Sequence, residues 1–449
     1  MLTFKKITFL CLSVFLSIYS IAQYKLSCRI ENYAHREVKV FTLFGDEAEY
    51  VESVQTNINS AFEFSFDKKE VGLYRLYLDN NEYFDLIFNN ENIQLSTFVE
   101  NPVYNMKVIE SNENFQLYEF LKMEFMYKYK IQILEQFMSI YPDETFTKTV
   151  EKEKAKQLKE KNDLLIKVIN LNKNSFAGKY LTYFKEVTAP EKLSIEKKQE
   201  FYRKEYLKSY DFSSVLMLKS NAYQKVVLDY LKLFRATDAD VYYVAGKDVL
   251  DHIFFEEPVI FNTIFEFILN GFETIGLVEQ SSKLSLEFGD LCSDASDNLK
   301  ARIKANTELT IGKKAPDFTV QTLSGQTYTL SKMKSNYTLI LFWATWCGHC
   351  QLTIPTFAEA QQLFDAASVD IIAISLDKDK KELNEFLSKN PFPWNIACDY
   401  KSWDGKQVID YSVYATPIMY LVDKDLNIVA KPYDEQRLFR ELEKILYRN

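Results

Sequence analysis

Two cysteines separated by two residues, Cys347 and Cys350, are the part of this chain whose type and spacing could perform chemistry. They follow a continuous apolar run at 337–342, which predicts a buried strand, and we expect a helix to begin at Cys347. In the first turn of a helix two sulfurs come within bonding distance, and unpaired backbone N–H groups favour a thiolate at the first cysteine. We therefore predict a redox-active Cys347–Cys350 disulfide, with Cys347 as the attacking nucleophile and Cys350 as the resolving thiol.

Half of a zinc site is the alternative interpretation of this cysteine pair. Zinc needs two further ligands at a compatible spacing, and Cys28, Cys292 and Cys398 are scattered and form no second pair. We expect these three residues to be packing thiols. The sequence therefore favours redox chemistry and predicts neither a metal site nor a cofactor.

Length and composition set the class of protein. With 449 residues, 47% of them hydrophobic and 26% charged, the chain is globular and too long for a single core. Its formal net charge is −9 and it has no basic cluster, which argues against nucleic-acid binding.

Residues 1–22 have the pattern of an export signal. Lys5 and Lys6 precede an apolar stretch, and Ser20 and Ala22 supply small side chains before a cleavage point. We predict a cleavable signal peptide, a mature chain starting near residue 23, and a location in the periplasm or cell envelope. An uncleaved N-terminal anchor is the alternative.

Three regions with different patterns follow the signal, so we expect a multidomain protein. Residues 23–110 alternate apolar and polar residues in short stretches, which predicts an all-β antiparallel sandwich or barrel. Residues 111–305 have helical spacing, with a long charged helix at 144–173 and a last helical stretch at 279–305. Residues 311–449 alternate strands and helices, which predicts an α/β sheet.

Local signals in residues 311–449 are clear enough to place individual elements. Besides the strand at 337–342, the pattern predicts hairpin strands at 318–323 and 327–330, strands at 369–375, 418–422 and 428–430, and helices at 380–389 and 434–447.

The segment around the cysteines resembles that of TlpA/ResA-type thioredoxin-like proteins. The sequence FWATWCGHC at 342–350 is similar to their active-site segment, and GKKAPDF at 312–318 resembles their N-terminal hairpin. The resemblance implies a thioredoxin fold in which one proline bends the active-site helix and a cis-proline loop binds the backbone of a substrate peptide beside the disulfide. The residues that it implies as supports of the redox pair are Trp346, Gly348, His349, Pro355, Thr416 and Pro417.

Three positions bear on how the pair would be tuned. Thioredoxins proper carry a buried acid six residues before the first cysteine, where this chain has Leu341. Related reductases place an acid just after the next core strand, near Asp377, although a solvated turn carboxylate is the alternative interpretation of that residue. His349 next to a thiolate would stabilise the reduced form and raise the reduction potential, unless it is an exposed spacer.

The family resemblance implies an enzyme that reduces disulfides of exported proteins and receives electrons from a thiol-type donor in the membrane. A disulfide oxidase or isomerase, which His349 favours, is the nearest alternative. The other alternative is a binding protein in which residues 24–305 capture a partner and the thioredoxin domain is a sensing appendage. Residues 71–74 and 83–87 resemble an uncharacterised extension found in envelope proteins of Bacteroidota-type bacteria, which implies a compartment and an architecture but no activity.

Overall fold

The computed structural model describes residues 24–78, 82–141, 143–190, 192–234 and 239–448, so the predicted signal peptide lies outside the described part. The chain forms two compact units. The first comprises the described residues up to Leu43 together with Ala48–Lys185, and the second comprises Phe44–Glu47 together with the described residues from Glu186 onward. The boundary at 185 divides the predicted helical region 111–305 between the two units.

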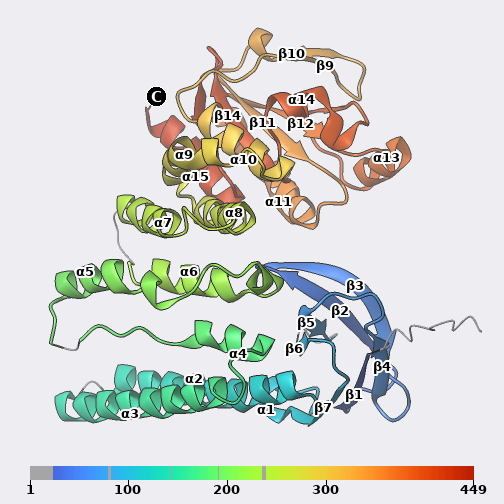
Figure 1. The fold of residues 1–449 in the computed structure, drawn as a ribbon. Coiled ribbons are helices and arrows are strands. Elements are labelled where there is room, and N and C mark those ends of the chain that lie inside the picture. Colours follow the sequence, from blue (N-terminus) through green and yellow to red (C-terminus); the bar gives the residue numbers. More distant parts are fainter. Residues whose placement is uncertain (1–23, 79–81, 142, 191, 235–238, 449) are drawn as a thin grey trace, which may run out of the picture. The chain divides into compact units, whose positions relative to one another are not determined.

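Two four-stranded sheets begin the chain (Figure 1). In one sheet the strands run in the order β4 (Ala61–Ser65), β1 (Lys25–Glu31), β7 (Ile93–Phe98), β8 (Lys107–Glu110). In the other the order is β3 (Glu47–Gln55), β2 (Glu37–Phe44), β5 (Gly72–Tyr77), β6 (Tyr83–Phe88).

Aromatic side chains join the two sheets. Phe66, which follows β4, stacks on Phe88 of β6 with ring centroids 3.9 Å apart, and its ring also meets Tyr74 of β5 edge to face. All three rings are buried, so the sheets enclose one apolar core, and the predicted all-β sandwich is confirmed. The expectation of purely antiparallel strands is wrong, because β1 and β7 pair in parallel. These strands are far apart in sequence, and no hairpin connects them directly.

Long helices complete the first unit. α2 (Asn112–Ile140) and α3 (Glu144–Ile169) lie side by side, followed by the short α4 (Phe176–Leu181); α1 (Pro102–Asn105) precedes β8. Asp143 caps α3 by accepting a hydrogen bond from the N–H of Phe146. The helix ends at Ile169 and not at the predicted 173, because the asparagine-rich segment that follows favours turns.

The second unit begins with helices. These are α5 (Ile195–Glu205), α6 (Ala222–Lys232), α7 (Asp240–His252), α8 (Pro258–Ile275), α9 (Val278–Phe288) and α10 (Asp297–Thr307). The predicted stretch 279–305 is two helices, because a 3₁₀ turn follows α9 and the hydroxyl of Ser296 caps the start of α10. Gly276 caps the end of α8, and its φ of 79° lies in the left-handed region that glycine adopts without strain.

A five-stranded sheet occupies the C-terminal part. Its order is β13 (Asn395–Cys398), β12 (Val369–Ser375), β11 (Tyr337–Trp343), β14 (Ile418–Asp423), β15 (Ile428–Ala430). The three strands β13, β12 and β11 are parallel, whereas β14 runs antiparallel to β11. β11 is central and apolar on both faces, as a strand buried between two neighbours requires.

The other elements of this part are the hairpin β9 (Thr319–Gln321) and β10 (Thr327–Thr329) and the helices α11 (Gly348–Glu359), α12 (Gln361–Ala366), α13 (Lys380–Lys389), α14 (Lys406–Asp410) and α15 (Glu435–Arg448). The predicted α/β fold is confirmed. Among the described residues, no helix combines the length and the apolar character that crossing a membrane requires.

Candidate active site

The cysteine pair lies where β11 ends and α11 begins. Cys347 is the N-cap residue of α11, and its sulfur accepts a hydrogen bond from the backbone N–H of Cys350 at 3.1 Å. A hydroxyl or carboxylate usually takes this place at a helix start, and here a sulfur does. The strand before it is anchored by Trp343, whose buried ring packs against Phe386 and Phe392. The sequence therefore folds so that Cys347 is held among the unpaired N–H groups of a helix.

The two thiols differ in their surroundings. Cys347 keeps 8% of its surface exposed, whereas Cys350 is completely buried. Burial raises the pKa of Cys350 to about 12, and the hydrogen bond and charge of neighbouring Cys347 act in the same direction. Both cysteines are free thiols in this structure. A reagent therefore meets Cys347 first, while Cys350 stays protonated near neutral pH.

A loop distant in sequence closes over Cys347. The Thr416–Pro417 peptide bond is cis, and the carbonyl oxygen of Thr416 accepts a hydrogen bond from the Cys347 thiol at 3.3 Å. The structure thus brings the loop against the cysteine pair, at the place where the resemblance implies it. Its contact with a substrate peptide stays a prediction.

Asp377 is part of the same site, although it touches the segment before the cysteines. The residue is 1% exposed, so its interpretation as a solvated turn carboxylate is wrong. Its carboxylate accepts hydrogen bonds from the backbone N–H of Thr345 at 3.1 Å, from the Thr345 hydroxyl at 2.5 Å and from the Ser375 hydroxyl at 2.6 Å. Gln351 of α11 donates to the carbonyl of Thr345 at 2.6 Å. These bonds fix the turn that leads into Cys347.

Removing the Asp377 carboxylate is expected to destabilise the protein. Asp377→Ala leaves the Thr345 N–H and two hydroxyls without their buried partner, which we expect to lower the free energy of unfolding by about 3 kcal/mol. Urea unfolding followed by tryptophan fluorescence measures this loss.

Two variants make the Asp377 measurement specific. Asp377→Asn keeps one acceptor oxygen and should lose less stability, by about half. Asp370→Ala changes an exposed carboxylate on β12 and should stay within about 0.5 kcal/mol of the wild type. Equal losses for Asp377→Ala and Asp370→Ala would contradict a structural role for the buried carboxylate.

The remaining predicted supports surround the helix start. Trp346 is 53% exposed beside the cysteines, and Gly348 and His349 are exposed in the first turn of α11. Pro355 lies inside α11, as expected for a proline that bends this helix. Leu341 is fully buried in β11, so the position of the usual acid is apolar here.

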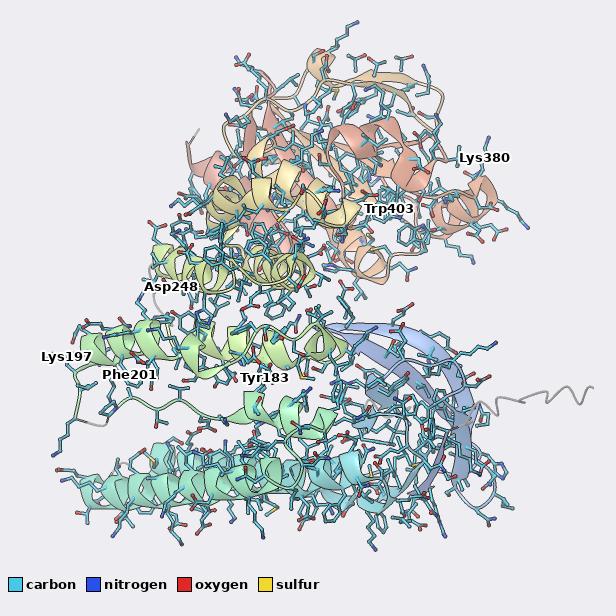
Figure 2. All side chains as sticks on the ribbon, in the orientation of Figure 1. Tyr183, Lys197, Phe201, Asp248, Lys380 and Trp403 are labelled. Carbon is cyan, nitrogen blue, oxygen red and sulfur yellow. The ribbon has the colours of Figure 1, made fainter. Side chains whose placement is uncertain are left out.

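Trp403 was not predicted from the sequence to lie at the site. Its ring lies 6.1 Å from that of Trp346, and the residue is 43% exposed in the 3₁₀ turn Ser402–Asp404; Figure 2 labels it. A tryptophan among the charged and small residues Asp399, Asp404 and Gly405 was the signal that could have indicated an exposed aromatic side chain.

The other three cysteines of the described part do not join the site as a pair. Cys28 and Cys292 are buried, and burial raises the pKa of both thiols. Cys398 is partly exposed, and its thiol donates a hydrogen bond to the carbonyl of Asp377 at 3.3 Å. Within the described residues, no three His, Cys, Asp or Glu side chains gather closely enough to hold a metal ion.

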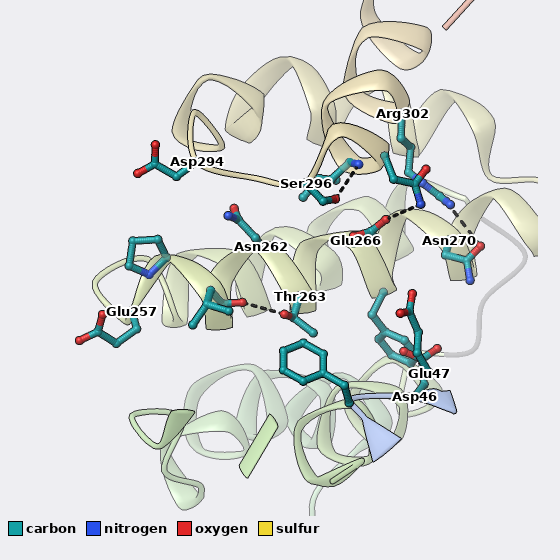
Figure 3. A pocket seen from close by; sticks show the side chains of 16 residues that line it. Asp46, Glu47, Glu257, Asn262, Thr263, Glu266, Asn270, Asp294, Ser296 and Arg302 are labelled. Atoms are coloured by element: carbon teal, nitrogen blue, oxygen red, sulfur yellow. Dashed lines mark hydrogen bonds between the residues drawn. The ribbon is translucent and has the colours of Figure 1, made fainter. Parts of the chain in front are cut away.

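A pocket of about 770 Å³ opens elsewhere in the second unit, between α8, the start of α10 and the turn Phe44–Glu47 (Figure 3). Its carboxylates are Asp46, Glu47, Glu257, Glu266 and Asp294. Burial raises the pKa of Asp46 and Glu266, and Asn298 donates a hydrogen bond to Glu266 at 3.2 Å. None of the predicted site residues lines it.

Comparisons with known proteins concern the C-terminal part. Residues 311–431 match the AhpC/TSA family. The chain is 31% identical over 148 residues to the thiol-disulfide oxidoreductase ResA of Bacillus cereus, a match that covers 32% of this chain and 83% of that protein. It is also 31% identical over 137 residues to the thioredoxin-like protein YneN of Bacillus subtilis, covering 28% and 78%.

Two solved structures are similar to parts of the chain. One is the thioredoxin domain of a thiol-disulfide oxidoreductase from Bacteroides vulgatus, with 25% identity and a TM-score of 0.29, covering 30% of this chain and 98% of that one. The other is a thioredoxin-like protein from Bacteroides caccae, with 19% identity and a TM-score of 0.42, covering 58% of this chain and 98% of that one.

Proposed function

Because the chain belongs to the ResA-like thiol-disulfide oxidoreductases, we propose that it reduces disulfides of exported proteins through Cys347 and Cys350. The observation that carries this proposal is the difference between the two thiols within one helical turn. Cys347 keeps 8% of its surface exposed and its sulfur accepts a hydrogen bond from a helix N–H, whereas Cys350 is completely buried and protonated. This is the asymmetry that ordered dithiol exchange needs.

The reaction proceeds by two exchanges at sulfur. The Cys347 thiolate attacks one sulfur of a substrate disulfide, the substrate S–S bond breaks, and the departing sulfur leaves as a thiolate and takes a proton. The product is a mixed disulfide between Cys347 and the substrate. The Cys350 thiolate then attacks Cys347, which releases the second substrate thiol and leaves a Cys347–Cys350 disulfide. Two electrons pass from the enzyme to the substrate.

The order of these steps follows from the environment of Cys350. In the free dithiol, hydrogen bonding and charge from Cys347 help to raise the pKa of Cys350. Once Cys347 is tied up in a mixed disulfide, its negative charge is gone and the pKa of Cys350 falls. Cys350 therefore gains reactivity in the intermediate, where it is needed. With Leu341 in place of a buried acid, water or a substrate group accepts the proton.

The compartment and the electron source are part of the proposal. The export signal pattern in residues 1–22 supports a location in the periplasm or cell envelope. Each reduction leaves the enzyme oxidised, so a second thiol protein must return two electrons to the Cys347–Cys350 disulfide. A thiol-type donor in the membrane fits both requirements.

A disulfide isomerase or oxidase is the second candidate, and exposed His349 beside the pair favours it. The reduction potential separates the two candidates. We expect insulin reduction with dithiothreitol as electron donor, and a glutathione titration midpoint near the roughly −270 mV of thioredoxin. A midpoint near the roughly −180 mV of protein disulfide isomerase would contradict the reductase. His349→Ala is expected to shift the midpoint to a more negative potential.

A further inference from the structure

Tyr414 connects the active-site loop to the preceding helices. It lies between α14 and β14, two residues before Thr416, the residue whose carbonyl accepts the hydrogen bond from Cys347. The Tyr414 hydroxyl donates to the carboxylate of Glu273 near the end of α8 at 2.9 Å. Tyr414 and Glu273 are 141 residues apart in sequence and belong to the same compact unit.

Glu273 is held firmly enough to serve as an anchor. Arg302 of α10 donates to the same carboxylate oxygen at 2.7 Å, and Asn306 donates to the other oxygen at 2.8 Å. The side chains of Arg302 and Glu273 are 8% and 16% exposed, so this ion pair is largely shielded from water. α10 therefore holds both oxygens of Glu273 in place independently of Tyr414.

Arg302 also contacts Tyr414 directly. Its guanidinium carbon lies 4.4 Å from the centre of the Tyr414 ring, which is the geometry of a cation–π interaction. Burial and the neighbouring Glu273 raise the pKa of Tyr414 well above its usual value. The hydroxyl therefore remains protonated and keeps donating over the whole physiological range. Arg302 contacts the Tyr414 ring and Glu273 accepts the hydrogen bond of its hydroxyl, so both parts of the side chain are held in place.

Two further contacts join the same helices to the C-terminal α/β region. Lys431 donates to the carbonyl of Ala305 near the end of α10 at 2.9 Å, and Arg437 of α15 donates to the carbonyl of Ile275 at the end of α8. Cations favour the last carbonyls of a helix, which have no partner within the helix. Burial lowers the pKa of Lys431 to about 8, in keeping with a poorly hydrated interface.

From these contacts we infer that α8 and α10 position the Thr416–Pro417 loop, with Tyr414 as the positioning residue held by Glu273 and Arg302. The inference rests on the proposed function, because it concerns the same cysteine pair. It gives part of the helical region a role in the redox chemistry. In the reduced state, while Cys347 is protonated, the Thr416 carbonyl accepts a hydrogen bond from its thiol, which stabilises the dithiol relative to the disulfide. A loosened loop weakens that bond.

Tyr414→Phe tests this inference because it removes the hydroxyl and keeps the ring. In a glutathione titration of the full chain, we expect the dithiol–disulfide equilibrium to shift toward the disulfide by roughly threefold, the size of a weak hydrogen bond. Glu273→Gln removes the charge that fixes Arg302, and we expect it to shift the equilibrium in the same direction. Circular dichroism of each variant verifies the fold, and if Tyr414→Phe does not fold, Glu273→Gln decides.

Tyr243→Phe is the matched control. The Tyr243 hydroxyl donates to Glu287 at 2.7 Å between α7 and α9, so the same chemical change occurs in the same unit without a link to the loop. We expect its titration midpoint to equal that of the wild type. A Tyr414→Phe midpoint that matches this control, or that moves toward the dithiol, overturns the inference. Failure of the proposed function is a different result, since the wild type itself would then not reduce insulin.

Discussion

Cys347→Ser is expected to bring insulin reduction down to the rate of dithiothreitol alone. A serine hydroxyl cannot attack a disulfide, and Cys350 cannot replace Cys347 because it is completely buried and its pKa is about 12. Cys292→Ser is the matched control, because this thiol is in the same compact unit but donates to the carbonyl of Phe288 in α9, away from α11. We expect this control to keep wild-type activity.

Cys350→Ser is expected to fail at a later step. Cys347 can still attack, but no resolving thiol remains, so a mixed disulfide with the substrate accumulates. Non-reducing gel electrophoresis followed by mass spectrometry of the trapped partner measures this species and identifies the substrate. If both single variants keep reducing insulin at the wild-type rate, the assignment of the two cysteines is wrong.

Elements with strong local signals were predictable from sequence. The strand at 369–375 and the helix at 380–389 have their predicted bounds. The apolar run of β12 indicates a buried strand, and Asp379 caps α13 by accepting the N–H groups of Lys381 and Glu382. The short elements β13, α12 and α14 were missed, because four to six residues are too few to display a period and, unlike β9, β10 and β15, none of them belongs to a hairpin.

Pairing between distant segments was not predictable in the same way. The strand pattern of residues 23–110 indicates a sandwich, but it does not say that β1 pairs with β7 in parallel. Alternation fixes which face of a strand is buried and leaves the choice of neighbour to the packing of the whole domain. The division of 279–305 into α9 and α10 depends on Ser296 acting as an N-cap. A serine within a helical pattern does not by itself indicate that a new helix begins there.

In the candidate site too, residues with a local sequence signal were predictable and residues with long-range contacts were not. Cys347 and Cys350 were found because their chemistry depends on two positions three residues apart. The contacts of Asp377 with Thr345 and of Tyr414 with Glu273 span 32 and 141 residues, and an acid or a tyrosine gives no local sign of its partner. The structure therefore adds mainly the contacts of the residues that hold the cysteine pair in place. Of these two contacts, the one between Tyr414 and Glu273 reaches outside residues 311–431, the part of the chain that matches the AhpC/TSA family.

Cys350 is expected to resist alkylation about 10³-fold better than an ordinary thiol at pH 7. The pKa of Cys350 is raised from 9.0 to about 12, so three pH units separate its thiolate fraction from that of a free cysteine, and iodoacetamide reacts with the thiolate. The experiment uses Cys347→Ser, in which no disulfide with Cys347 can form. Burial is the largest cause of the shift and persists in this variant, so we expect at least about 10²-fold protection there.

Mass spectrometry of the Cys350 peptide over time measures the rate, and the same chain unfolded in guanidinium chloride is the reference. The native rate should rise about tenfold per pH unit from pH 7 to beyond pH 9, where the reference levels off. The raised pKa of Cys350 also makes the stability of the reduced protein decrease with pH. Between pH 9 and 12 the folded dithiol binds more protons than the unfolded chain, so the reduced protein loses stability as the pH rises. Equal native and unfolded alkylation rates at pH 7 would show that Cys350 is neither buried nor held protonated, and the order of the two thiols in the reaction would then have no basis in their environments.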